Sequence, residues 1–333
     1  EVVNTPLLER VNGYPDYIQC QAALSQGRIT DFSQCATLSV TVASLRSGNS
    51  DLEPEESESS SYGVVFEPQF IPEKFGTVTL TTDFWSIEQK NPIGLLNDSV
   101  ALSYDYLLRL QGSSNPNVIR ADPTPQQIAD FAGTGYDPVG DVVNVVARFT
   151  NLSALKVEGI DYGAYWDVPV GSGDLSVNVN ATYLNTYYQS PTDEAAAILA
   201  GLDDGTVNPY VTVTGGGSLI RENGRPEWKY SMSMSYDIAN WKFGAFSQYT
   251  SEVFQTSVSS TSYGPWPIED HTTWNFYGQY TVENDAWTDG TAIRVGVRNA
   301  FNEDPPLADT YGYLSSVYQP LPHYWYVNVK KSF

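Results

Sequence analysis

The sequence predicts an all-β fold, a transmembrane antiparallel β-barrel to which this chain contributes about nine strands. Three observations lead to this prediction. Large apolar and polar residues alternate along most of the chain after residue 57, as in strands with one oily and one wet face. The connections between these segments are short and long in turn, and the apolar stripes end in Tyr, Trp or Phe.

The composition narrows the class of protein. The 333 residues hold 17 Lys and Arg against 39 Asp and Glu, a formal net charge of −22. A chain this acidic repels phosphate, so a duplex-binding surface is excluded and nucleic acid is not an expected partner. No apolar run reaches the ~18 residues of a membrane-spanning helix, whereas the strands of a barrel need no such run.

The alternation is clearest in residues 228–236, where five large apolar or aromatic side chains are separated by a lysine and three serines. Similar stripes end in aromatic residues, which suit the boundary between water and hydrocarbon. A large soluble β-sandwich or solenoid is the alternative, and it would bury the stripes against each other. The nine predicted strands lie near residues 59–69, 76–90, 153–168, 174–189, 224–238, 241–254, 270–284, 291–301 and 323–333.

The connections separate into two classes. An outer-membrane barrel has short turns on one side and long loops on the other, and a sandwich or propeller has no reason to separate them. Helical spacing in residues 98–110, and Pro125 ahead of residues 126–131, predict short helices in the first long loop. Short connections hold residues 72–74, 171–173, 239–240 and 284–290, and long ones cover about 91–152, 190–223, 255–269 and 302–322.

The two cysteines, Cys20 and Cys35, lie 15 positions apart. With only His271 and His323 as histidines, a zinc site has too few ligands. A disulfide in an oxidising compartment is the favoured interpretation, worth about 3 kcal/mol by loop entropy. Two reduced thiols are the alternative, and we expect neither a metal nor a cofactor.

Several segments carry a family resemblance. Residues 48–57, GNSDLEPEES, fit the pattern G-N-x-x-L-x-P-E-x-S. The segments VEGIDYG at 157–163 and GVRNAFNEDPP at 296–306 follow in the same order. Together they resemble motifs of TonB-dependent outer-membrane receptors, and the resemblance covers essentially the whole chain. The first motif is carried by Gly48, Asn49, Leu52, Pro54, Glu55 and Ser57.

The resemblance implies that the chain is the C-terminal portion of a larger, 22-stranded type of barrel. Residues 1–56 would then be an extracellular loop region with the disulfide, and residues 57–333 the C-terminal strands. No segment resembles the plug domain or the TonB box. Lys331 stands where the family usually has an apolar or aromatic residue. The signal read by the barrel-assembly machinery would be Phe333, Val329, Val327 and Trp325.

The function implied is energy-coupled uptake of a scarce nutrient across the outer membrane of a Gram-negative bacterium. The ligand would be a siderophore, an oligosaccharide or a cobalamin-like molecule. Expected partners are outer-membrane lipid, the barrel-assembly machinery and the TonB complex, the last through a plug domain that this chain lacks. The alternatives are a passive porin, a barrel-embedded hydrolase and a soluble secreted β protein.

Loop side chains are the candidates for ligand contact. Aromatic rings could stack on sugars or flat chelates, or could equally pack the loops together. Adjacent carboxylates such as Asp203 and Asp204 are a weak basis for catalysis, and we predict no catalytic residue. The candidate ligand-contacting residues are Tyr210, Arg221, Arg225, Tyr263, Trp266, Tyr311, Tyr313 and Tyr318.

Overall fold

The computed structural model describes two compact units. The mixed unit comprises Glu1–Ser57, Gln89–Leu155 and Tyr188–Gly217, and the sheet unit comprises Glu58–Glu88, Lys156–Tyr187 and Ser218–Phe333. Within these bounds the described residues are 7–10, 17–32, 34, 41–95, 97–207, 211, 213, 216–260, 264–284, 286–308 and 312–331.

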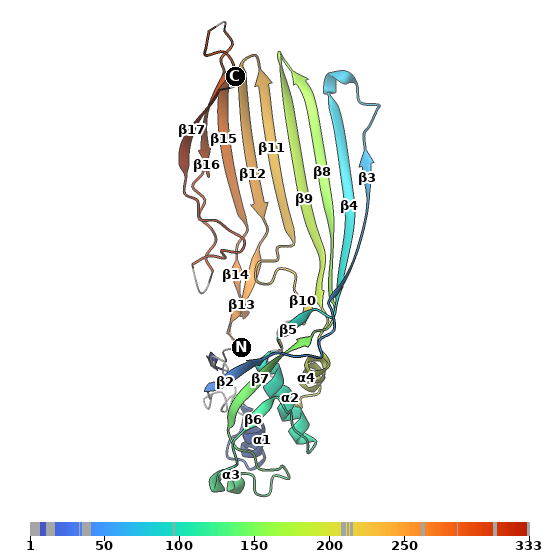
Figure 1. The fold of residues 1–333 in the computed structure, drawn as a ribbon, viewed down its shortest axis with the longest axis vertical. Helices are drawn as coiled ribbons and strands as arrows, with labels where there is room; N and C mark the ends of the chain where they lie inside the picture. The colour runs from blue at the N-terminus through green and yellow to red at the C-terminus, as the bar shows by residue number, and fades with distance from the viewer. Residues whose placement is uncertain are drawn as a thin grey trace. The chain divides into compact units, whose positions relative to one another are not determined.

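The sheet unit is built on nine long strands that neighbour one another in sequence order (Figure 1). Each printed pairing from β9 to β17 is antiparallel. All nine predicted strands are confirmed, with described ends within four residues of the prediction. The strands are β3 (Glu56–Phe66), β4 (Thr77–Lys90), β8 (Leu155–Val170), β9 (Gly173–Gln189), β11 (Trp228–Ile238), β12 (Trp241–Thr250), β15 (His271–Thr281), β16 (Thr291–Arg298) and β17 (Tyr324–Lys331).

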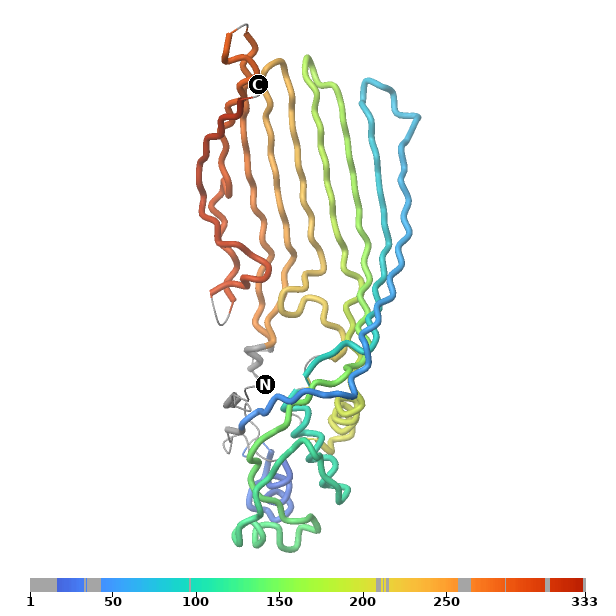
Figure 2. Tube along the Cα trace, viewed as in Figure 1, coloured from blue at the N-terminus to red at the C-terminus, as the bar shows by residue number. Residues whose placement is uncertain are grey.

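The predicted separation of connection lengths is also confirmed. The four short connections gather at one end of the strands, the upper end in Figure 1, and the first contains the 3-10 helix η2 (Glu73–Phe75). Figure 2 shows β3 in blue and β17 in red at opposite edges of the sheet. A hairpin of β13 (Val253–Ser260) and β14 (Gly264–Ile268) forms within one long connection, and the two-residue β10 (Gly217–Ser218) pairs with β9.

The strand register divides the sheet into an apolar face and a polar face. Met234, Ala245, Phe276 and Val297 form one row across β11, β12, β15 and β16 on the apolar face. Its side chains are exposed, with 68% of Val327 accessible. None of the three hydrophobic clusters among the described residues contains a residue of these rows. The stripes therefore do not meet across a dry interior, and the soluble-sandwich alternative is wrong.

Aromatic rings mark both ends of the apolar face. At the long-connection end, the ring centroids of Trp228 and Tyr183 are 4.6 Å apart, as are those of Tyr230 and Tyr249. At the short-connection end, Trp241 and Tyr280 lie 4.9 Å apart. Two aromatic belts around a band of aliphatic side chains are typical of a strand-built membrane surface.

The last described strand places part of the predicted insertion signal. Trp325, Val327 and Val329 pair with residues of β16 on the apolar face, and Lys331 follows on the same face by strand parity. Phe333 lies outside the described residues. The recognition of this strand by assembly machinery remains a prediction.

The mixed unit contains the helices, none of which is long and apolar enough to cross a membrane among the described residues. Its sheet has the order β1-β2-β7-β5, with β6 also paired to β7, and β2 runs parallel to β7. Its strands are β1 (Leu7–Arg10), β2 (Thr41–Ser47), β5 (Ile93–Leu95), β6 (Val118–Arg120) and β7 (Val142–Asn151), and its helices are α1 (Tyr17–Ser25), α2 (Asp98–Leu110), α3 (Pro125–Asp130) and α4 (Asp193–Asp203).

Local sequence explains the helices that were predicted. The Asn97 side chain caps α2 by accepting a hydrogen bond from the Ser99 N–H, and Thr124 and Gln127 form a capping box on α3. Helices α1 and α4 and strands β1, β2, β5, β6 and β7 were not predicted. Cys20 in α1 is disulfide-bonded, and Cys35, its predicted partner, lies outside the described residues.

The family motif of residues 48–57 fastens three chain segments of the mixed unit. The Asn151 amide accepts from the Glu53 N–H at 2.9 Å and donates to the carbonyls of Glu53 and Asn91 at 2.8 and 2.9 Å. The Glu55 carboxylate accepts from the Ile93 N–H at 2.5 Å. These bonds give the glutamates of the motif a structural role in holding β5 and the end of β7.

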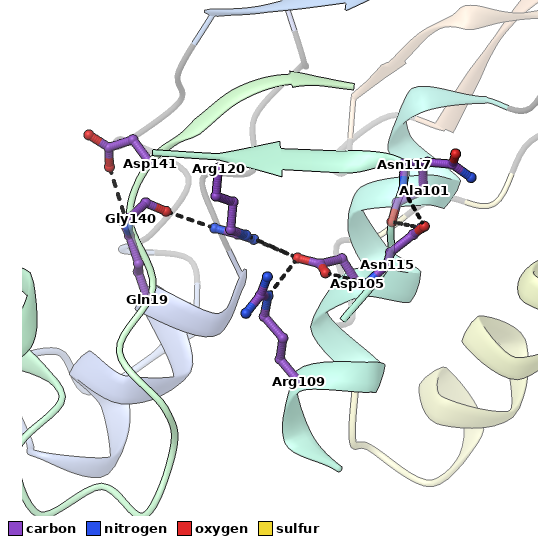
Figure 3. Close-up of polar contacts among 9 residues, drawn as sticks. All are labelled: Gln19, Ala101, Asp105, Arg109, Asn115, Asn117, Arg120, Gly140 and Asp141. Atoms are coloured by element: carbon purple, nitrogen blue, oxygen red, sulfur yellow. Dashed lines mark hydrogen bonds and ion pairs between the residues drawn. The ribbon is translucent and has the colours of Figure 1, made fainter. Parts of the chain in front are cut away.

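A buried ion cluster links α2 to β6 (Figure 3). The fully buried Asp105 carboxylate accepts from the Arg109 Nε at 3.0 Å, from an Arg120 terminal nitrogen at 2.8 Å and from the Asn115 N–H at 2.8 Å. Arg120 also donates to the Gly140 carbonyl at 3.1 Å. Such a cluster stabilises the fold only while every member is paired.

A buried asparagine holds the connection between β16 and β17. Asn299, 6% exposed, takes the left-handed φ of 46° that Asn tolerates well. Its N–H donates to the Asn275 side chain at 2.9 Å, and its amide donates to the carbonyls of Glu303 and Leu321 at 2.8 and 2.9 Å. Both ends of the connection are therefore tied to β15.

We expect Asp105→Asn to destabilise the mixed unit by about 3 to 5 kcal/mol, because two buried guanidinium groups lose their counter-charge. Amide hydrogen exchange of α2 and β7 should accelerate by about two to three orders of magnitude. The control is Asp130→Ala, which removes an exposed hydrogen bond to Gln126 in the same unit and should change stability by under about 0.5 kcal/mol. Unchanged protection in Asp105→Asn would contradict the role of the cluster.

We expect Asn299→Ala to cost about 2 to 4 kcal/mol, because buried backbone groups lose their partners. The check is the rate of protease cleavage in residues 302–323, together with the temperature at which the barrel loses its compact gel mobility. Asn302→Ala is the control, because Asn302 shares the positive φ but its side chain accepts a single 3.3 Å bond from the His323 N–H. Equal effects of the two substitutions would show that backbone conformation, not the buried bonds, matters.

Candidate functional site

The polar face of the sheet is hollowed at its long-connection end. The cavity has a volume of about 800 Å³. Its wall comes from alternate residues of β9, β11, β12, β15, β16 and β17, and one end is covered by the connection between β16 and β17. The polar-face lining comprises Asn180, Thr182, Lys229, Ser231, Gln248, Thr250, His271, Thr273, Asn275, Tyr277, Arg298 and Tyr326, and the connection adds Asn299, Glu303, Val317, Tyr318, Gln319 and Leu321.

Strand register fixes the hydroxyl and amide groups of this wall. Ser231, Gln248 and Thr273 form a row across β11, β12 and β15. Side chains on paired strands are held more firmly than those on free loops, so the donors and acceptors of the row keep their spacing. The row can form several hydrogen bonds with a polar molecule without a change in the backbone.

Two arginines on β16 lie against tyrosine rings. The guanidinium carbon of Arg294 is 4.2 Å from the ring centroid of Tyr277, and that of Arg298 is 5.9 Å from the centroids of Tyr324 and Tyr326. Arg294 also donates two hydrogen bonds to the Gln279 side chain. These contacts restrict the positively charged side chains on the polar face.

Tyr318 closes one end of the cavity. Only 4% of it is exposed, and its ring meets that of His271 edge-on with centroids 5.2 Å apart. Burial, and the nearby Asp270 carboxylate, raise the pKa of Tyr318 above its ordinary value. Its hydroxyl has no hydrogen-bond partner among the described residues. An unpaired buried hydroxyl costs about 1–3 kcal/mol, so a ligand or loop movement that supplies a partner is favoured here.

The described candidate residues separate into two groups. Tyr318 lines the cavity, and it also packs with Val253 and Ile268 in a hydrophobic cluster to which Tyr313 is added. Trp266 donates from its indole nitrogen to the Leu307 carbonyl at 3.1 Å. The tyrosine at 318 therefore combines packing with access to the cavity wall, whereas Trp266 and Tyr313 contact other loop residues.

The two arginine candidates also contact protein groups. Arg221 pairs with Glu252 at 2.5 Å on an exposed surface. The Arg225 guanidinium carbon lies 4.7 Å from the ring centroid of Tyr187, and the same side chain donates to the Glu222 carbonyl. Neither arginine lines the cavity. Tyr210, Tyr263 and Tyr311 lie outside the described residues.

The sequence analysis missed most of the cavity wall. Gln248, Asn275, Tyr277, Arg298 and Tyr326 were not candidates, although the period-two pattern puts all of them on the polar face. That parity was the signal that could have identified them. Across the described part of the chain, no group of three or more His, Cys, Asp or Glu side chains could hold a metal ion.

Comparisons with known proteins agree with this geometry. A family model described as TonB dependent receptor-like, β-barrel matches residues 13–300. The siderophore receptor PirA from Acinetobacter baumannii is 16% identical, with a TM-score of 0.51, over 97% of this chain and 35% of that one. A mutant of the ferric enterobactin receptor PfeA from Pseudomonas aeruginosa is 13% identical, with a TM-score of 0.50, over 87% of this chain and 32% of that one.

A comparison with curated protein sequences finds no match. The chain spans about a third of the length of the two solved receptors. At these identities the structural likeness shows a shared fold, whereas the family model covers most of the chain. The chain therefore belongs to the TonB-dependent receptor family of the Gram-negative outer membrane, whose members are transporters rather than enzymes, and it forms part of their β-barrel.

Proposed function

We propose that this chain forms the C-terminal part of a receptor barrel that takes up a scarce nutrient with energy supplied through TonB. The polar-face cavity is the observation that carries this proposal, because it combines fixed hydroxyl, amide and tyrosine groups with a loop cover. The plug domain that would contact TonB belongs to a part of the receptor outside this sequence. Assembly machinery would act on the strand that ends with Trp325, Val327, Val329 and Phe333.

Within this proposal the ligand is a ferric siderophore, an oligosaccharide or a cobalamin-like molecule. The two solved receptors are described as siderophore and ferric enterobactin receptors, which favours the first class. The cavity wall suits a large polar ligand, because uncharged hydrogen-bonding groups outnumber its charged groups. Lys229 and Arg298 could neutralise an anionic ligand, with Glu303 limiting the net positive charge.

Ligand binding to the complete receptor tests the cavity. Ferric enterobactin, a maltooligosaccharide and cyanocobalamin would be titrated separately against the detergent-solubilised receptor. We expect one of them to bind, and Gln248→Leu with Thr273→Val to weaken that binding about tenfold, because two polar contacts are lost at similar side-chain volume.

The matched control for this test is Thr281→Val. Thr281 lies on the same strand and face as Thr273 but outside the cavity. Its substitution should leave the dissociation constant unchanged. Wild-type affinity in the double variant would remove the cavity from the proposed function.

Conductance distinguishes the receptor from a porin with the same strands. A barrel filled by a plug should give no steady current when the complete receptor is inserted in a planar lipid bilayer, since the water path is blocked. A porin would give stable open-channel steps under the same voltage. Stable steps at the single-channel level would favour passive diffusion over TonB-coupled uptake.

A further inference from the structure

The apolar face carries a groove near the short-connection end. The groove has a volume of about 500 Å³ and is lined by Trp241 on β12, Gly278 and Tyr280 on β15, and Ile293 and Val295 on β16. Trp241, Tyr280 and Ile293 form one row of the register. Gly278 and Val295 lie in the next row toward the middle of the strands. The groove therefore crosses three adjacent strands.

Gly278 creates the floor of the groove. A Cβ added there would meet only the Phe243 ring, at the ordinary contact distance of 3.6 Å. The space above Gly278 is therefore not filled by a neighbouring side chain. Glycine is unfavourable inside a strand, and it is found where a ligand or another chain approaches the backbone closely.

The groove lies at a defined depth in the membrane. Gly278 is three residues from Thr281, the last residue of β15, which corresponds to about 10 Å along a strand. Short connections of outer-membrane barrels face the periplasm. The groove thus lies just inside the headgroup region of the periplasmic leaflet, where Trp241 and Tyr280 can place their polar atoms among headgroups.

A positive charge lies at the headgroup side of the groove. Lys331 pairs with Thr291, which is two residues from Ile293 on the same face of β16. The Lys331 ammonium donates to the carbonyl of Asp289 in the short connection. An ammonium has three donors, so this bond positions the charge while leaving it able to meet a phosphate.

We propose that this groove holds one acyl chain of a periplasmic-leaflet phospholipid whose phosphate meets Lys331. The site is continuous with the surface that already faces lipid, so its occupant reaches it by diffusion in the leaflet. Its apolar lining suits a hydrocarbon chain, and the lysine suits the phosphate. This bound lipid is distinct from the nutrient ligand, which would lie on the opposite face of the same strands.

The test uses the complete receptor in outer-membrane vesicles and phosphatidylethanolamine that carries a photoreactive group in one acyl chain. We expect crosslinks to concentrate on peptides of β12, β15 and β16. Gly278→Leu, which fills the groove, should reduce these crosslinks about tenfold, and Lys331→Gln should reduce them severalfold. Native mass spectrometry after mild detergent extraction should show one retained phospholipid, lost in Gly278→Leu.

Val177→Leu is the matched control, because it enlarges an apolar-face side chain of β9 far from the groove in the register. It should retain the crosslinks and the bound lipid. Val295→Trp fills the groove from β16 and replaces Gly278→Leu if that variant does not fold. Uniform crosslinking over the apolar face, retention of lipopolysaccharide alone, or unchanged binding in the folded groove variants would overturn the proposal.

Discussion

The constraint on which the sheet unit depends is that backbone N–H and C=O groups in hydrocarbon need a partner within the protein. Each unpaired group costs several kcal/mol there. Within the nine-strand order, β3 and β17 have a neighbour on one side only. With nine strands alternating in direction (Figure 1), joining these edges to each other would make a parallel pair. An antiparallel barrel therefore requires further strands, in keeping with solved receptors about three times as long.

Only the ends of the strands escape this constraint, and the two ends differ. The short connections carry few groups beyond those needed to reverse the chain. The long ones are held by buried polar side chains, Asn299 in the sheet unit and Asp105 in the mixed unit. Buried polar networks specify one loop arrangement because no other satisfies the same groups. Positions that contact a ligand can then vary without loss of the loop conformation.

The same distinction explains what the sequence could predict. Strand β11 was predictable because its lipid-facing alternation is local, and parity also places Gln248 on the polar face. Strands β2 and β7 were not, because a parallel pair links segments about 100 residues apart and Ser44 faces Val145 without a local pattern. Loop candidates failed for a related reason: the sequence around Trp266 does not reveal that its indole bonds to the Leu307 carbonyl.

Period-two geometry has a final consequence on β15. Thr273 and Gly278 belong to opposite faces of one strand, one on the cavity and one on the groove. Adjacent positions therefore answer to different solvents, water and hydrocarbon, and to different ligands. Substitution at one position changes volume or hydrogen bonding on its own face while the ladder of backbone bonds stays intact. A receptor can thus acquire a new nutrient specificity through odd-numbered positions of β15 without altering the lipid contacts of the even-numbered ones.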